Sequence, residues 1–126
     1  MLKTSVTSPN AAAVGPYSHA VHDGRTLYLS GQTPIDPATG ELRQGDIGAQ
    51  TDQCLDNLFD VLAADGLGPE HVVQVRVYLT DMGDFATMNA AYAARFQEPY
   101  PARTTIGVAA LPMGAQVEID LVAVRG

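Results

Sequence analysis

The chain has 126 residues, enough for one domain with a hydrophobic core and too few for two. Lys and Arg number 7 against 14 Asp and Glu, a formal net charge of −7 with no run of basic residues, so we expect no nucleic-acid partner. No apolar run has the length of a signal-peptide core or a membrane span, and we therefore expect a single cytoplasmic domain over residues 1–126.

The single cysteine and the three histidines do not predict a metal site. Cys54 falls at an apolar position of a helical pattern, which favours a buried thiol over a reactive one. His19 and His22 are expected to be partly exposed residues of a hairpin, and His71 lies at the start of another strand. Their spacing fits no shared metal, so we expect neither a metal nor a cofactor.

Strands and loops alternate in the first third of the chain. The expected segments are a strand at 2–6, a loop at 8–19, strands at 20–22 and 25–31, and a loop at 34–45 with its turn at 36–40. The two middle strands predict a hairpin with Asp23-Gly24 as its two-residue turn, because glycine accepts positive φ.

Two amphipathic helices are expected further on. The first has Asp46 as its N-cap and Gly66 as its stop, with an apolar stripe of Ile47, Thr51, Cys54, Leu58, Val61 and Leu62. The second has Asp84 as its N-cap, with a stripe of Phe85, Met88, Asn89, Tyr92 and Phe96. Asn89 is the polar exception on that stripe and would need hydrogen-bond partners if buried.

Three further strands complete the pattern. They lie at 72–79, where Val73, Val75, Val77 and Leu79 form the expected buried face, near 101–108, and at 116–124. The element order is strand, hairpin, helix, strand, helix, strand, strand. This order predicts an α+β sandwich with two helices on one face of a largely antiparallel sheet of five or six strands.

Alternation along these strands predicts where the candidate functional side chains point. The apolar sets expected to face the helices are Thr104, Ile106 and Val108, then Val117, Ile119, Leu121 and Ala123, and Leu27 with Leu29. Arg103, Thr105, Glu118 and Ser30 would then share the opposite face. A guanidinium binds a carboxylate ligand and a strand-borne glutamate can hold water or move a proton, although a plain surface ion pair between Arg103 and Glu118 fits the spacing equally well.

The face away from the helices is expected to be an interface. It would carry Val72, Tyr78, Val122 and Val124, a set too apolar to be left in water. Another subunit should cover it, so that a pocket holding Arg103 and Glu118 would lie at or beside a subunit interface, closed by Tyr17 of the 15–18 loop.

Several separated motifs make the sequence resemble the reactive intermediate deaminase family known as RidA or YjgF. They are Gly15-Pro16-Tyr17-Ser18, Ser30-Gly31-Gln32, Asp56-Asn57-Leu58, Asn89-Ala90-Ala91-Tyr92, Pro101-Ala102-Arg103-Thr104-Thr105, Leu111-Pro112 and Val117-Glu118-Ile119. The resemblance implies a chorismate-mutase-like α+β fold of the bacillary type and a homotrimer with inter-subunit sites. It also implies a 2-iminobutanoate/2-iminopropanoate deaminase, a hydrolase that converts enamines and imines such as 2-aminoacrylate to 2-keto acids and ammonia without a cofactor.

The resemblance also implies roles for individual residues. Arg103 would bind the substrate carboxylate, and Glu118 would position water and move protons. The expected substrate-binding residues are Tyr17, Ser30, Gly31, Asn89 and Thr105. The chain departs from the family pattern at His19, where glutamine is usual, and at Thr104-Thr105, where many members have Ser-Cys. These departures affect substrate preference more than chemistry.

Two other functions stay open at this stage. One is a non-catalytic small-ligand-binding or holdase-like stress protein that uses the same cleft. The other is the ribonuclease activity attributed to some members of the family, which the acidic composition and the lack of a basic stripe disfavour.

Overall fold

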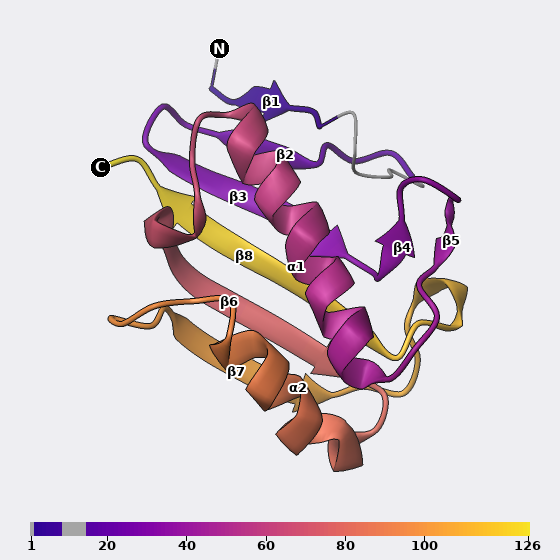
Figure 1. Cartoon of the computed structure of the whole chain (residues 1–126). Coiled ribbons are helices and arrows are strands. Elements are labelled where there is room, and N and C mark those ends of the chain that lie inside the picture. The colour runs from indigo at the N-terminus through magenta and orange to yellow at the C-terminus, as the bar shows by residue number, and fades with distance from the viewer. Residues whose placement is uncertain (1, 9–14) are drawn as a thin grey trace.

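The computed structural model describes residues 2–8 and 15–126, and a mixed six-stranded sheet forms its centre (Figure 1). Its strands are β1 (Thr4–Val6), β2 (Ala20–His22), β3 (Thr26–Gln32), β6 (Val72–Leu79), β7 (Ala102–Gly107) and β8 (Val117–Val124). The spatial order is β1-β2-β3-β8-β6-β7, and only the β6–β7 pair is parallel. The last strand therefore lies in the middle of the sheet and β7 at one edge.

Two α-helices cover one face of this sheet within the described residues (Figure 1). α1 (Ile47–Ala64) runs across the central strands, and α2 (Phe85–Ala93) lies over the β6–β7 edge. The predicted α+β class, element order and one-sided helix layer are confirmed. The predicted 34–45 loop also contains a small second ribbon, β4 (Ile35–Asp36) paired with β5 (Glu41–Leu42).

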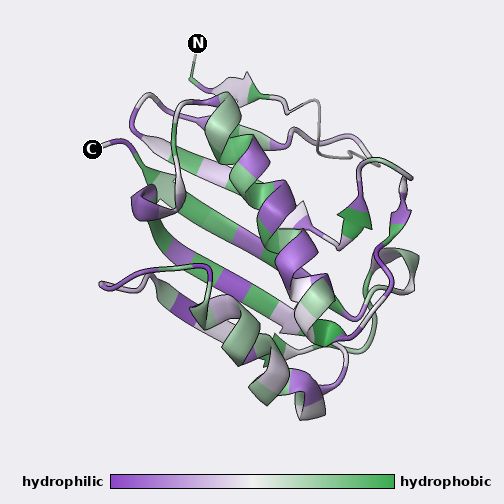
Figure 2. Cartoon of the chain, in the orientation of Figure 1, coloured by the Kyte–Doolittle hydropathy of each residue, from purple (hydrophilic) through white to green (hydrophobic). Residues whose placement is uncertain are grey.

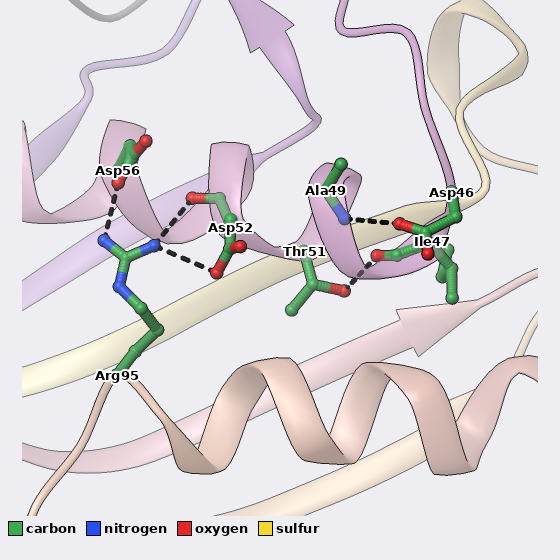
Figure 3. A network of polar contacts seen from close by, with 7 residues as sticks. All are labelled: Asp46, Ile47, Ala49, Thr51, Asp52, Asp56 and Arg95. Atoms are coloured by element: carbon green, nitrogen blue, oxygen red, sulfur yellow. Dashed lines mark hydrogen bonds and ion pairs between the residues drawn. The ribbon is translucent and has the colours of Figure 1, made fainter.

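α1 forms where the sequence predicts it, because its signals are local. The Asp46 side chain accepts a hydrogen bond from the Ala49 amide at 2.9 Å, which caps the helix start (Figure 3). Thr51 is buried and its hydroxyl donates to the Ile47 carbonyl at 2.7 Å. Gly66 follows the helix with a φ of +76°, the left-handed conformation expected after a helix end.

The hydrophobic core lies between α1, α2 and the sheet. Figure 2 shows hydrophobic residues interrupted by hydrophilic ones along β6 and β8, which are neighbours in the sheet. Fully buried residues of the core include Cys54, Leu55, Leu58, Val61, Leu62, Val75, Val77, Leu79, Met88, Val117 and Ile119. The buried thiol at Cys54 was predicted, and burial raises its pKa well above the ordinary value. No helix of the described chain is long and apolar enough to cross a bilayer.

α2 begins at Phe85, with Asp84 at the N-cap position as predicted, but it ends at Ala93, before Phe96. Asp84 makes no side-chain cap; instead the Asp81 side chain accepts from the Gly83 amide at 2.8 Å and starts a 3-10 turn, Met82–Asp84, ahead of the helix. Met88 is buried as expected, but Asn89 is exposed and does not belong to the buried stripe. Asn89 is exposed because α2 is short and the side of the helix that carries Asn89 faces solvent.

The end of α2 is tied to α1 by Arg95. Its Nη2 donates to Asp56 Oδ1 at 2.5 Å, and its Nη1 donates to the carbonyl and carboxylate of Asp52 at 3.1 and 3.2 Å (Figure 3). The guanidinium also lies over the Phe59 ring, 5.2 Å from the centroid. This network holds the end of α2 against α1. It thereby also holds in place Tyr92, the α2 residue that contacts Arg103 of β7.

The N-terminal hairpin differs from its prediction in two details. The Asp23 amide donates to the Thr26 carbonyl at 3.3 Å, so the two-residue turn is Gly24-Arg25, one position later than expected, with Gly24 at a φ of +101°. His19 is buried, not partly exposed, because its Nδ1 accepts from the Ser8 amide at 3.1 Å and holds the β1 segment. Positions 9–14 of the predicted loop lie outside the described residues.

β6 contains an irregularity that exchanges two predicted valines. The pairing with β8 shifts between Val72 and Gln74, so one residue bulges out of the ladder. Val72 is consequently 7% exposed and Val73 47% exposed, the reverse of the prediction. Val75, Val77 and Leu79, beyond the bulge, are buried as predicted.

Candidate functional site

Arg103 and Glu118 project from opposite faces of the sheet. Arg103 pairs laterally with Val75, which is fully buried beneath the helices, so Arg103 lies on the helix face. Glu118 pairs with Tyr78 and alternates with buried neighbours, so it lies on the other face. The prediction that Arg103, Thr105, Glu118 and Ser30 share one face is therefore wrong, and so is a site built from Arg103 and Glu118 of the same chain.

The error arises in β7, where apolar residues occupy the exposed side. Thr104 is exposed and Ile106 is 44% exposed, although both were expected to face the helices. β7 is an edge strand, and its neighbouring helix α2 is short, so polar side chains can face the helix layer without entering the core. Polarity therefore does not identify the inner face of this strand.

Arg103 is held by aromatic rings instead of by an acidic partner. Its guanidinium carbon lies 4.7 Å from the Tyr92 ring centroid and 5.6 Å from that of Phe85. Arg103 makes no salt bridge or side-chain hydrogen bond with any residue that the structure describes. The guanidinium fork is therefore oriented and still available to a ligand carboxylate.

An open pocket of about 370 Å³ surrounds this guanidinium. Its lining residues are Asn89, Tyr92, Ala93, Tyr100, Pro101 and Arg103. Two buried hydroxyls on this side of the sheet, those of Tyr92 and Thr105, have no hydrogen-bond partner among the described residues. Burial raises the pKa of the Tyr92 phenol, and the positive charge of Arg103 opposes that shift. We call this pocket, together with Thr105, the arginine half-site.

A second pocket, of about 320 Å³, holds Glu118 on the other side of the sheet. Its lining residues are Tyr17, Ser30, Gly31, Thr33, Pro112, Met113 and Glu118. The Ser30 hydroxyl donates to the Ser18 carbonyl at 2.7 Å and so anchors the loop that carries Tyr17. We call this pocket the glutamate half-site.

A bulge in β3 brings the main chain against the Glu118 carboxyl group. Leu29 pairs with Leu121 and Gln32 with Ile119, so Ser30 and Gly31 together oppose the single residue Asp120. A Cβ atom on Gly31 would overlap Glu118 Oε2 and lie 3.0 Å from Cδ. Only glycine leaves the carboxyl group in this position, which alternation alone does not reveal.

The environment of Glu118 favours the protonated form of its carboxyl group. Burial raises the pKa of its carboxyl group, and the negative charge of Asp120 raises it further. A carboxyl group with a raised pKa is a better base than an ordinary carboxylate and can serve as general base and then as general acid. The predicted site residues thus form two sets: Arg103, Thr105 and Asn89 in the arginine half-site, and Glu118, Tyr17, Ser30 and Gly31 in the glutamate half-site.

The described residues contain no group of three or more His, Cys, Asp or Glu side chains arranged to hold a metal ion. The side chains of the two half-sites can bind an anion through the Arg103 guanidinium and transfer protons through the Glu118 carboxyl group.

Comparison with known proteins gives a consistent result. Residues 7–125 match the family described as Endoribonuclease L-PSP. The mouse protein named 2-iminobutanoate/2-iminopropanoate deaminase is 45% identical over 98% of this chain and 92% of its own length. Protein DfrA of Myxococcus xanthus is 49% identical over 98% of this chain and 97% of its own length.

Solved structures agree with the sequence matches. RidA from the Antarctic bacterium Psychrobacter sp. PAMC 21119 superimposes with a TM-score of 0.93 at 44% identity, covering 97% of this chain and 99% of that one. The YjgF gene product of E. coli superimposes with a TM-score of 0.91 at 39% identity, covering 98% and 99% of the two chains. The family match, the full-length relatives and the shared fold together assign this chain to the RidA/YjgF/L-PSP family.

Proposed function

We propose that this protein hydrolyses small enamine and imine acids, such as 2-aminoacrylate, to 2-keto acids and ammonia. The observation that carries the proposal is the Arg103 guanidinium, which is oriented by two aromatic rings and lacks an acidic partner among the described residues. Such a fork suits the carboxylate that every 2-imino acid carries. The name of the mouse relative supports the same reaction class.

The complete site would lie between two subunits. The arginine half-site binds an anion, and the glutamate half-site transfers protons, but the sheet separates them within one chain. The face away from the helices leaves Tyr28 50% exposed and Ile106 44% exposed, an apolar surface suited to a second copy. In a homotrimer, each interface would join the arginine half-site of one subunit to the glutamate half-site of its neighbour.

The reaction needs only orientation and proton transfer. An enamine such as 2-aminoacrylate would first become the imine by gaining a proton at C3 and losing one from nitrogen. With the substrate carboxylate on Arg103, Glu118 would accept a proton from a water molecule as its oxygen attacks the C=N carbon, and would pass that proton to the nitrogen to give a carbinolamine. Glu118 would then move the hydroxyl proton of the carbinolamine to the nitrogen as the C–N bond breaks, which releases ammonia and forms the C=O bond of the keto acid. Arg103 also explains how an acidic protein attracts an anion, because its positive charge acts locally.

An assay coupled to a serine or threonine dehydratase tests the activity. The wild-type protein should accelerate keto-acid formation, and Arg103→Ala and Glu118→Ala should each abolish the acceleration. A mixture of the two inactive variants tests the shared site. If two subunits build each site, random mixed oligomers regain about a quarter of the wild-type activity, since both halves are intact at one interface in four.

The outcomes separate the alternatives. A wild-type protein that binds a keto acid through Arg103 but gives no acceleration would refute the deaminase and favour the non-catalytic ligand-binding protein. Active single variants would also refute the assigned roles. A mixture that stays inactive, although mass spectrometry detects mixed oligomers, would exclude a site shared between subunits.

A further inference from the structure

Near Glu118, two side chains donate hydrogen bonds to the same carboxylate. Arg76 Nε donates to Asp120 Oδ1 at 2.8 Å, and the Tyr78 hydroxyl donates to Asp120 Oδ2 at 2.9 Å. The strand register places Arg76 opposite Asp120 and Tyr78 opposite Glu118, all on the face away from the helices. We call Arg76, Tyr78 and Asp120 the Asp120 triad. Its members do not line either half-site.

The triad takes up the hydroxyl of the residue that pairs with Glu118 across the strands. Tyr78 is the direct cross-strand partner of Glu118, yet its hydroxyl is directed diagonally to Asp120. Glu118 itself makes no side-chain hydrogen bond or ion pair with a residue in the described part of the chain. A donor to a carboxylate would stabilise the charged form, so this arrangement withholds that stabilisation from Glu118.

The two charged members of the triad differ in solvent exposure, and this difference determines whether the triad favours the neutral or the charged form of Glu118. The Arg76 side chain is 55% exposed and the Asp120 side chain only 14% exposed. Solvent therefore screens the positive charge more than the negative one. Asp120 and Glu118 lie two residues apart on the same face of β8, so Glu118 experiences mainly the negative charge.

We propose that Asp120 is a positioning residue for Glu118, which keeps the Tyr78 hydroxyl away from the Glu118 carboxyl group and makes that group a stronger base. The catalytic meaning of this inference rests on the proposed function, but the electrostatic effect does not. The direction of the Glu118 pKa agrees, because burial raises it first and the charge of Asp120 second. The pKa of Tyr78 is likewise raised by burial and by its hydrogen bond to Asp120.

The other groups around Glu118 do not replace this effect. The titratable or charged side chains that face it or interact with it are Asp120 from β8, Tyr78 and Arg76 from β6, Tyr17 from the loop before β2, and Cys54 from α1. β3 contributes Ser30 and Gly31 at this point, which do not titrate. Asp120 is thus the one acidic group placed next to Glu118 among the residues that the structure describes.

The test uses two substitutions that remove opposite charges. Asp120→Asn should shift the titration midpoint of Glu118 to lower pH, and Arg76→Gln should shift it to higher pH. The midpoint is read directly by carbon NMR of the labelled glutamate carboxyl in the full chain, assigned with Glu118→Gln. The acidic limb of kcat/KM in the coupled assay should move in the same two directions. Asp56→Asn, which breaks the remote ion pair with Arg95, is the matched control and should shift neither.

A double variant tests the role of the Tyr78 hydroxyl. Asparagine has one acceptor oxygen instead of two, and if that oxygen stays with Arg76, the Tyr78 hydroxyl loses its acceptor in Asp120→Asn and can donate to Glu118. Adding Tyr78→Phe should then reverse part of the downward shift. The proposal is overturned if Asp120→Asn and Arg76→Gln leave the Glu118 midpoint unchanged or move it in the same direction. Should Asp120→Asn fail to fold by circular dichroism, the direction measured for Arg76→Gln decides alone. A protein without deaminase activity would refute the proposed function, while the NMR titration would still decide the role of Asp120.

Discussion

Substituting Gly31 by alanine should disable Glu118 without unfolding the protein. The added Cβ would overlap Glu118 Oε2 and lie 3.0 Å from Cδ, where ordinary contacts begin at 3.4 Å. The main chain of β8 is fixed in the middle of the sheet, so the side chain of Glu118 has to move. Gly31 does not have a positive φ, and alanine therefore fits its backbone conformation.

The size of the effect follows from this displacement. Clearing the overlap moves the carboxyl group by about 1 Å, a misplacement that can cost about 100-fold in rate. A 100-fold fall in kcat/KM corresponds to about 2.7 kcal/mol of lost transition-state stabilisation. Stability should change little, because the half-buried Glu118 side chain can rotate and because replacing glycine restricts the unfolded chain.

The coupled dehydratase assay and a double-mutant cycle check this reasoning. Gly31→Ala should lower kcat/KM in the wild-type background and have little effect in Glu118→Asp, whose shorter side chain keeps a carboxyl group clear of the new Cβ atom. Gly48→Ala on α1, where the new Cβ would lie 3.3 Å from Asp46 Oδ1, is the control and should keep full activity. Full activity of Gly31→Ala, or an equal loss in both backgrounds, would falsify the assigned contact.

Three further substitutions probe the binding fork, a helix cap and the charge on Glu118. Arg103→Lys keeps the charge but loses the planar fork and its stacking on Tyr92, so KM in the coupled assay should rise by about tenfold or more; an unchanged KM would contradict carboxylate binding by the fork. Asp46→Ala removes the cap on the Ala49 amide and should lower the free energy of unfolding by about 1 kcal/mol in urea, whereas Asp46→Asn should keep most of it. Because the pKa of Glu118 is raised in the fold, the folded state binds more protons, and unfolding free energy should fall as the pH rises above the ordinary value of 4.5. Glu118→Gln should remove that fall, and an unchanged slope in urea unfolding across this range would contradict the raised pKa.

The elements that the sequence predicts well are those with local signals. α1 has a capping aspartate, a regular apolar stripe and a terminal glycine, all of which act within a few residues. The hairpin and β8 also follow their patterns closely. α2 is predicted with the right N-cap position, Asp84, but the capping hydrogen bond is made by Asp81 at the start of the preceding 3-10 turn, which the apolar stripe does not reveal.

The features that escape prediction depend on neighbours that are distant in sequence. The bulges at Ser30-Gly31 and after Val72 are both defined by the pairing of their strands with β8, which is distant in sequence. The orientation of Arg103 depends on β7 being an edge strand next to α2, which no alternation within β7 can reveal. The motifs contain residues of both half-sites, but pairing between strands determines which of them lie together.

The opposite orientation of Arg103 and Glu118 follows from the topology of the sheet. β6 continues through α2 into the parallel strand β7, so α2 returns on the helix face and Arg103 turns toward it. β8 lies on the other side of β6, and its Glu118 can meet the Tyr17 loop only on the open face. No side-chain rotation brings the two groups together around a small acid, because the sheet itself lies between them. In the proposed assembly, a second copy would supply the missing half without changing the fold, and cyclic symmetry would let every subunit contribute one arginine half-site and one glutamate half-site. Catalysis by this chain would therefore require assembly.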